Sequence, residues 1–580
     1  MGCKGLGCWE VAVIERRALL KGLAAVAALP VLTACSGRSG ADSGTSEDDF
    51  AGALSYRLTP PRSIDPFDAD VPGLAIAYQL FDQLMRYDFS TGELACWAAE
   101  SVDASDDATQ FTFRLRQGLV FSDGSAVDAQ GFKRAWERLV DPAGASTSVY
   151  GESPWAYLLT LVDGYDALRT GTAGELAGVT CPDAATLQVV LSKPYADFPL
   201  LCAHPALSPV PSAAVEDAES FHAQPVGNGP FTLANAWDGK AAILMERAEG
   251  YASPGGTDAA AGSDNAADDG GEAVARVRFV LNVDASNAYK QLEAGDIDVA
   301  DVPVEQLESA EKVFGPREEG LAFPDGCHLL SATSMIATYL VLNMAEPPFD
   351  RVEVRRALSL AIDREALCEK VFRGSCAPAT SVVPPCIPVE GQRDWTYAAY
   401  DTERAKQLLE PLYPAGEDGS RDLEISLAYS KGGSNAKLAD ALAEDFKAVG
   451  VSVKTEVSDW DDFVLRYRTG DFSCGCMNWT PEVPSLDSVL YPLFRSGVAA
   501  AGNYARYSNP EVDAALDSAR KTVESVARCT LQSQTMVKIA EDVPVIPLTF
   551  PLKTIATSPR VKALTLDPYG YPHLDEVTFT

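Results

Sequence analysis

The sequence predicts an α/β protein built from two lobes. Two separate regions, residues 277–299 and 423–457, each show the pattern strand, helix, strand, which is typical of parallel strands joined by a helical crossover. The chain has 580 residues, 47% of them hydrophobic, whereas a single hydrophobic core stops growing at roughly 250 to 300 residues. Two distant α/β units in a chain of this length indicate two lobes.

The first 34 residues predict an export signal followed by a lipid anchor. Arg16 and Arg17 precede an apolar run over residues 22–34, which is too short to span a bilayer and has the length of a signal-peptide core. The string Leu-Thr-Ala-Cys that ends at Cys35 resembles the lipobox of bacterial lipoproteins, which implies a diacylglycerol on Cys35 at the extracytoplasmic face of the bacterial cell membrane. A cleavage site with an incidental cysteine is the alternative. The arginine pair also resembles a twin-arginine signal, although it suits the general export route as well.

Strand and helix patterns follow in order, interrupted by two low-complexity stretches. Residues 35–50 predict a flexible Ser/Gly/Asp tether, and residues 253–273 predict a disordered acidic insertion without a binding role. Between them, alternating apolar residues at 111–115 indicate a strand, Ser-Asp-Gly at 122–124 indicates a turn, and apolar residues at helical spacing around Trp136 indicate a helix.

Two later units show the crossover pattern. Alternating apolar residues at 277–281 precede a helix that ends at Gly295, and a strand resumes at 297–299. The second unit has a strand at 423–427, a helix closed by Gly450 and a further alternating strand. Each unit therefore predicts parallel strands in a lobe of its own.

Composition and motifs exclude several classes of function. The net charge of −35 excludes nucleic acid as a natural partner, and an acidic surface mainly keeps an exported protein soluble. The four histidines form no spaced cluster with cysteines, so we predict no metal site and no cofactor. Ser-x-x-Lys occurs at 434–437 and 518–521, but the sequence lacks the other motifs of penicillin-recognising enzymes, zinc hydrolases and nucleotide-binding proteins. We therefore predict that the chain is not an enzyme.

Ten cysteines follow Cys35, in a compartment where disulfides persist. Cys376 and Cys386 flank a proline-rich loop, and a bridge between them would constrain the unfolded chain by roughly 3 kcal/mol. The pairing of the other cysteines stays open. We interpret Cys474 and Cys476 as structural or buried thiols rather than metal ligands.

A family resemblance is carried by four blocks of sequence, which contain the strings FTFRLRQGLVFSDG, PVGNGPFTL, RRALSLAIDREAL and YDTERAKQLL. In this order they resemble the oligopeptide-binding proteins of extracellular solute-binding protein family 5, the receptors of ABC peptide importers. The similarity runs from about Leu54 to the C-terminus. It implies the fold of periplasmic binding proteins, with two lobes, a hinge and an extra subdomain inserted in the first lobe.

The resemblance also implies how the chain is divided. Lobe I comprises residues 51–78, 205–338 and 543–580. The inserted subdomain comprises residues 79–204, and lobe II comprises residues 339–542. The chain then crosses between the lobes more than once, which is what makes a hinge.

Glu482 is the candidate ligand anchor. In family members that hold a free peptide N-terminus, a Trp is followed three positions later by an Asp that pairs with the ligand's ammonium group, and here Trp479 is followed by Glu482. A ligand amine would neutralise a carboxylate that is costly to bury alone. The chain departs from the family pattern, because Glu replaces Asp, Val483 replaces Tyr, and prolines stand at 481 and 484. An exposed, inert carboxylate at the rim and a different ligand contact are the alternatives.

Three residues before the anchor complete the candidate site. The resemblance implies that the backbone of Met477, Asn478 and Trp479 pairs with the ligand as an added strand, which would explain broad tolerance of peptide side chains. Trp479 has core packing as an equal alternative. Tyr157 is expected where the inserted subdomain approaches the cleft, and for it core packing is the favoured alternative.

Together these observations predict a lipid-anchored, monomeric solute receptor. It would bind extended oligopeptides between two closing lobes and deliver them to an ABC permease and its ATPase subunits for transmembrane transport. The alternatives are the same fold with another ligand (a dipeptide, nickel chelate, haem, sugar or signalling peptide) and a surface sensor or adhesin that does not transport.

Overall fold

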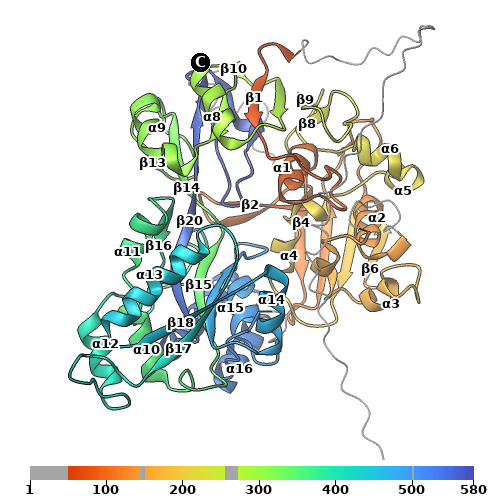
Figure 1. The fold of residues 1–580 in the computed structure, drawn as a ribbon. Helices are drawn as coiled ribbons and strands as arrows, with labels where there is room; N and C mark the ends of the chain where they lie inside the picture. Colours follow the sequence, from red (N-terminus) through yellow and green to blue (C-terminus); the bar gives the residue numbers. More distant parts are fainter. Residues whose placement is uncertain (1–49, 144–150, 255–271, 499–501) are drawn as a thin grey trace, which may run out of the picture.

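The computed structural model describes residues 50–143, 151–254, 272–498 and 502–580 (Figure 1). The predicted export signal, Cys35 and all of the tether except Phe50 lie outside these ranges. Most of the predicted acidic insertion also lies outside them, but its last two residues form β10 (Glu272–Ala273). The insertion is shorter than predicted, because β10 is paired with the backbone of β22 (Thr578–Phe579).

One mixed sheet runs through the molecule and contains thirteen of the strands in the described ranges. Its main path has the order β18-β17-β19-β15-β20-β12-β1-β11-β9-β8, with β13, β14 and β16 attached beside it. These strands are β1 (Leu54–Arg57), β8 (Phe231–Leu233), β9 (Ile243–Arg247), β11 (Arg276–Val280), β12 (Val299–Asp301), β13 (Glu318–Glu319), β14 (Leu329–Thr333), β15 (Ala337–Leu342), β16 (Cys376–Pro378), β17 (Glu424–Ser430), β18 (Ser452–Ser458), β19 (Cys474–Trp479) and β20 (Val545–Thr557).

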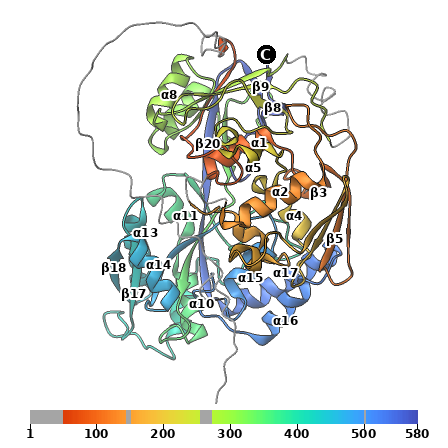
Figure 2. The same ribbon diagram turned by 90° about the vertical axis from the view of Figure 1, so that its right-hand side faces the viewer.

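The longest of these strands, β20, passes from one half of the molecule to the other (Figures 1 and 2). Its residues 545–549 pair with β15, and its residues 552–556 pair with β14. The chain crosses a second time between β14 and β15, at residues 334–336. Two crossings side by side have the geometry of a hinge.

Both predicted crossover units are present. Strands β17 and β18 are parallel and joined by α13 (Asn435–Ala448), while β11 and β12 lie parallel on either side of β1 and are joined by α8 (Ala285–Ala294). Gly295 caps α8 with φ 80°, and Gly450 follows α13 with φ 86°, so both glycines end their helices in the left-handed conformation. The prediction of an α/β fold is confirmed.

The predicted inserted subdomain has a different sheet. Its strands are antiparallel in the order β4-β5-β7-β6 and lie beside α2, at the right of Figure 1. Its bounds are β4 (Ala99–Ala104), β5 (Gln110–Leu115), β6 (Val179–Asp183), β7 (Thr186–Val190) and α2 (Ala129–Val140). Its buried residues belong to the same hydrophobic cluster as those of lobe I. Two further clusters contain most of the buried apolar residues of the predicted lobe II and also include residues of the segment 543–548, which the sequence assigned to lobe I.

The remaining elements cover these sheets. A hairpin of β2 (Met85–Asp88) and β3 (Glu93–Cys96) precedes β4, and β21 (Val561–Ala563) pairs with β22. The helices are α1 (Val71–Leu80), α3 (Tyr165–Arg169), α4 (Phe198–Leu201), α5 (Ala213–Glu216), α6 (Ala218–Ala223), α9 (Leu307–Phe314), α10 (Val352–Ala361), α11 (Arg364–Ala366), α12 (Thr402–Leu409), α14 (Trp460–Thr469), α15 (Asp487–Phe494), α16 (Pro510–Ala519) and α17 (Ser525–Asp542). Within the described ranges, none of the helices has both the length and the apolarity needed to cross a bilayer.

Gly475 provides a test of how tightly β19 is held. A Cβ atom there would lie 1.7 Å from Tyr467 Oη and 2.4 Å from Ala428 O, so Gly475→Ala must displace β19 from β17. We expect a loss of about 1 to 3 kcal/mol of stability, the usual cost of overpacking a core, seen as a lower thermal midpoint. Gly174→Ala is the matched control, because nothing lies within 4 Å of its Cβ position. An equal midpoint for both variants would contradict this account of the strand.

Candidate functional site

The candidate site is built on the C-terminal half of β19. Its residues Met477, Asn478 and Trp479 pair antiparallel with Tyr339, Thr338 and Ala337 of β15. On its other side, β19 pairs with β17 only at Cys474 and Gly475. No strand in the described part of the chain covers that side of residues 476–479. Alternate backbone groups of a strand point to opposite sides, so this edge offers donors and acceptors to a further extended chain.

The loop after β19 carries Glu482 and is fixed at several points. Ser488 accepts a 2.9 Å hydrogen bond from Trp479 Nε1 at its carbonyl, and its hydroxyl accepts a 3.0 Å bond from Glu482 N. From lobe I, Tyr569 Oη donates to Pro481 O at 3.3 Å. The loop is therefore held by residues of both lobes. The indole N–H of Trp479 is used by the fold, while its half-buried ring packs against the core of lobe II.

The side chain of Glu482 is exposed, while its neighbour Val483 is buried in the same hydrophobic cluster as lobe I. Burial raises the pKa of the Tyr569 hydroxyl, and the charge of Glu482 raises it further. The pKa of Tyr571 is raised in the same way by burial, by Asp567 and by Glu482. The carboxylate of Glu482 thus lies close to two tyrosines of lobe I, at the boundary between the lobes.

These tyrosines belong to a tight turn that sequence reasoning missed. Asp567 Oδ1 accepts from Tyr571 N at 2.8 Å, and Asp567 N donates to Tyr571 O at 2.9 Å. Lys553 Nζ donates to Gly570 O at 3.2 Å and ties the turn to β20. The string Pro-Tyr-Gly-Tyr-Pro at 568–572, a turn signal with two aromatic residues, is what could have identified it.

A cavity of about 180 Å³ opens beside this turn. It is lined by the end of β1 with the residues after it, the first turn of α1, and Tyr569 to Tyr571. Its charged residues are Arg57, Asp301 and Lys553, and Arg57 Nη1 lies 2.9 Å from Asp301 Oδ2. The cavity is therefore lined by both aromatic and charged residues, as ligand pockets are.

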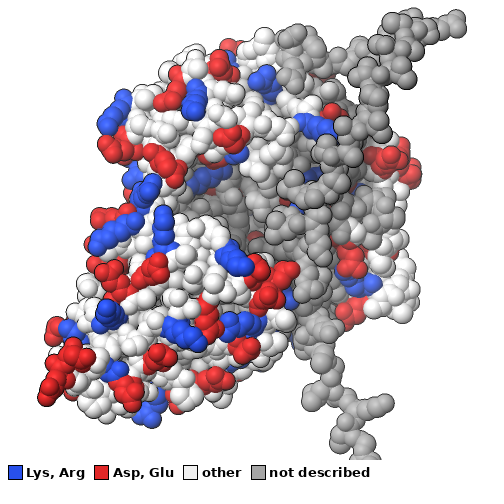
Figure 3. Space-filling model, viewed as in Figure 1, with Lys and Arg blue, Asp and Glu red and all other residues white. Residues whose placement is uncertain are grey.

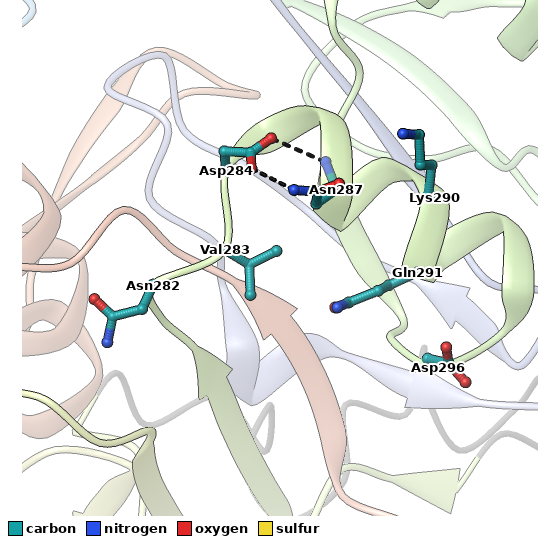
Figure 4. A pocket seen from close by; sticks show the side chains of 7 residues that line it. All are labelled: Asn282, Val283, Asp284, Asn287, Lys290, Gln291 and Asp296. Atoms are coloured by element: carbon teal, nitrogen blue, oxygen red, sulfur yellow. Dashed lines mark hydrogen bonds between the residues drawn. The ribbon is translucent and has the colours of Figure 1, made fainter.

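A larger depression of about 450 Å³ lies away from the lobe boundary, at the start of α8 (Figure 4). Asp284 caps this helix and accepts from Asn287 N at 3.0 Å and from Asn287 Nδ2 at 2.6 Å. The carboxylate is thus already used by the helix cap. We assign no ligand to this depression.

The molecular surface is hollowed between the two lobes, as Figure 3 shows, and acidic and basic side chains are interspersed on the face around the hollow.

Tyr157, the remaining candidate site residue, lies in the 3₁₀ helix η4 (Ala156–Leu159) of the inserted subdomain. It is half-buried against the core of lobe I, with its ring centroid 6.4 Å from that of Trp155.

The inserted subdomain also contacts lobe II through paired charges. Asp197 Oδ1 lies 2.8 Å from Arg528 Nε, and Ala196 N donates to Arg520 O at 2.9 Å. Arg520 in turn forms a bidentate pair with Asp487. Both carboxylates are buried, so each depends on its arginine. This contact was also missed, because charged residues far apart in sequence give no local signal.

The possible bridge between Cys376 and Cys386 stays a prediction, since the structure shows all of its described cysteines as free thiols. Cys376 lies against Cys368, with 3.0 Å between the sulfurs, and Cys386 lies 3.5 Å from Met335 Sδ. Cys376 is the first residue of β16, whose pairing with β20 fixes its position.

Comparisons with known proteins identify the fold. The model of the bacterial extracellular solute-binding proteins, family 5 Middle, matches residues 93–501. The chain is 29% identical over 516 residues to the periplasmic oligopeptide-binding protein OppA of Escherichia coli, covering 87% of this chain and 88% of that protein. It is 28% identical over 523 residues to the probable deoxycholate-binding periplasmic protein YgiS of Escherichia coli, covering 88% of this chain and 89% of that protein.

Solved structures also match this chain over most of its length. The unliganded open form of the periplasmic murein tripeptide binding protein MppA superposes with a TM-score of 0.75 at 25% identity, covering 91% of this chain and 97% of that chain. A second structure, of the murein tripeptide binding protein MppA from Escherichia coli, superposes with a TM-score of 0.61, covering 91% of this chain and 98% of that chain. The predicted fold of periplasmic binding proteins is confirmed.

The pKa of Asp567 allows a pH test of the tight turn at residues 567–571, which we call the tyrosine turn. Burial raises its pKa to about 6, so the folded protein keeps a proton there that the unfolded chain loses near pH 4. The contribution of Asp567 to the free energy of unfolding is fully present below pH 4 and is lost as the pH rises through 6. Asp567→Asn should remove this loss and be more stable at pH 7 than the unmodified protein, by about 1 to 3 kcal/mol.

Thermal midpoints between pH 4 and 7 measure this difference. The variant's gain over the unmodified protein should be largest at pH 7 and shrink toward pH 4. The same difference at all pH values would mean that Asp567 does not titrate in this range.

Proposed function

The chain belongs to the bacterial extracellular solute-binding proteins of family 5, and from this we propose that it binds extended oligopeptides between its lobes and delivers them to an ABC importer. The open edge of β19 at residues 476–479 supports the peptide as ligand more than any other feature. A peptide laid along this edge would pair through its main chain, so its side chains would be read only weakly.

Glu482 is the proposed partner of the peptide's amino group. Its loop is fixed from both lobes through Ser488 and Tyr569, so the carboxylate has a defined place at the end of the open edge. In this structure the side chain is exposed to water. Closure over a ligand would remove that water, and a charge-assisted hydrogen bond from an ammonium group would replace it.

The cellular setting is part of the same proposal. The receptor is anchored by a diacylglycerol on Cys35, works as a monomer, and passes its ligand to a permease driven by ATPase subunits. The lipobox-like string and the preceding apolar run support the anchor. The family supports the importer, because its members are binding proteins and this chain shows no nucleotide-binding motif.

A second candidate is an apolar ligand of the same cleft. The rings of Phe89, Tyr569 and Tyr571 form a row, with centroids 6.1 Å and 5.9 Å apart, beside the 180 Å³ cavity. Aromatic rows suit flat apolar molecules, and one relative is named for binding deoxycholate. The negative charge of Glu482 opposes an acidic ligand such as this, which is why we prefer the peptide.

Closure on peptides is the first test. Adding a saturating pool of tripeptides to pentapeptides to the purified protein should reduce its radius of gyration in X-ray scattering and raise its thermal midpoint, because ligand bound between the lobes stabilises the closed state. Deoxycholate serves as the comparison ligand. Closure with deoxycholate alone would support the second candidate, and no response to either would refute both.

The second test removes the proposed anchor charge. Glu482→Gln should weaken binding of a free peptide by about 30- to 5,000-fold, since removing the charge of one partner of a desolvated charge pair costs roughly 2 to 5 kcal/mol. The N-acetylated form of the same peptide should bind weakly to both proteins. Glu417→Gln, at an exposed position of another loop, is the control. Calorimetry that shows unchanged affinity in Glu482→Gln would remove Glu482 from the mechanism.

A further inference from the structure

Two buried thiols meet beside the crossing between the lobes. Cys368 lies on a short π-helical turn, η7 (Leu367–Val371), and Cys376 is the first residue of β16. Their side chains are 5% and 7% exposed, and their sulfurs are 3.0 Å apart. Among the cysteines of the described ranges, these two have their sulfurs in direct contact.

The backbone between them holds this approach independently of the sulfurs. Gly374 N donates to Cys368 O at 2.9 Å, and Ser375 N donates to Phe372 O at 3.0 Å. Arg373 and Gly374 both have positive φ, 54° and 78°, and reverse the chain. The turn therefore brings the two cysteines together before any bond forms between them.

We propose that Cys368 and Cys376 form a disulfide bond in the exported protein. Their contact is a hydrogen bond between the two thiols, which Cys376 donates to Cys368 in this structure. Either cysteine can react first as its thiolate, and the steps are the same with the two cysteines exchanged.

The reaction is a thiol–disulfide exchange with a disulfide oxidant, either a protein disulfide or oxidised glutathione. The Cys376 thiolate attacks one sulfur of the oxidant, forms a mixed disulfide and releases the other sulfur as a thiolate, which takes up the proton that Cys376 lost. Cys368 then loses its proton, attacks the Cys376 sulfur and releases the second thiolate, which takes up that proton. The two cysteines lose two electrons and two protons, and the oxidant becomes two thiols. Since both side chains are buried in the folded protein, the exchange takes place while the chain folds.

The bond would act on the hinge. Strand β16 pairs with residues 549–551 of β20, and Leu552 N donates to Ser375 O at 2.9 Å. These residues of β20 lie between its pairing with β15 and its pairing with β14. A covalent link from Cys376 to η7 would therefore fix the strand that lies beside the crossing. This inference is independent of the ligand.

Peptide mapping of the full-length protein tests the bond. The protein is refolded from denaturant in a mixture of oxidised and reduced glutathione, its free thiols are blocked with iodoacetamide, and it is digested with trypsin without reduction. Cleavage after Arg364 and Lys370 releases Cys368 in peptide 365–370, and cleavage after Arg373 and Arg393 releases Cys376 together with Cys386 in peptide 374–393. We expect these two peptides to be joined.

Two variants assign the bond. Cys386→Ser should leave the joined peptides intact, whereas Cys376→Ser should abolish them. Blocked Cys368 and Cys376 in the unmodified protein, or a joined species that survives in Cys376→Ser and disappears in Cys386→Ser, would overturn the proposal.

Hydrogen exchange gives an independent readout on the hinge. Reduction of the unmodified protein should speed exchange in peptides that cover residues 374–378. The Cys386→Ser variant should respond to reduction in the same way. Unchanged exchange of this segment on reduction would contradict the bond, because a link that closes the turn must restrict its opening.

Discussion

The strand β20 is the constraint on which the rest of the structure depends. Its thirteen residues pair with β15 in one lobe and with β12 and β14 in the other. Each half of the strand satisfies its backbone groups in a different lobe, so neither lobe can turn without bending the residues between them. Residues 549–552 and the neighbouring segment 334–336 are therefore where the chain passes between the two halves of the sheet.

The candidate site follows from this constraint. Strand β15 starts at the crossing and pairs with β19, which places residues 476–479 close to the hinge. The chain that leaves β20 returns through the tyrosine turn, and Tyr569 reaches Pro481 from the other lobe. A hinge motion that moves lobe II against lobe I must therefore change the surroundings of Glu482 directly.

Local patterns predicted the elements of this fold, but not its long-range pairings. Alternation and helical spacing located β5, α2, β17 and α13, and the glycines at 295 and 450 ended helices as expected. The antiparallel sheet of the inserted subdomain and the single sheet joined by β20 arise from pairing between distant residues. The contact of Cys376 with Cys368 was not predicted for the same reason, because the position of Cys376 is set by β20, more than 170 residues later. Glu482 was located through a family motif, whereas the tyrosines beside it come from the far end of the chain.

In the proposed function, the exposure of Glu482 gives a physical reason why the receptor would close only on a ligand. Closing without a ligand would remove water from the carboxylate while it faces Tyr569 and Tyr571, whose pKa values it already raises. It would also remove water from the open backbone edge at 476–479, and backbone groups that lose water without gaining a partner cost free energy. An extended chain with a positive end supplies hydrogen bonds to the edge and a counter-charge to Glu482 together. The closed state is then stabilised only when both are present, so the same groups that bind the ligand also determine when the lobes close.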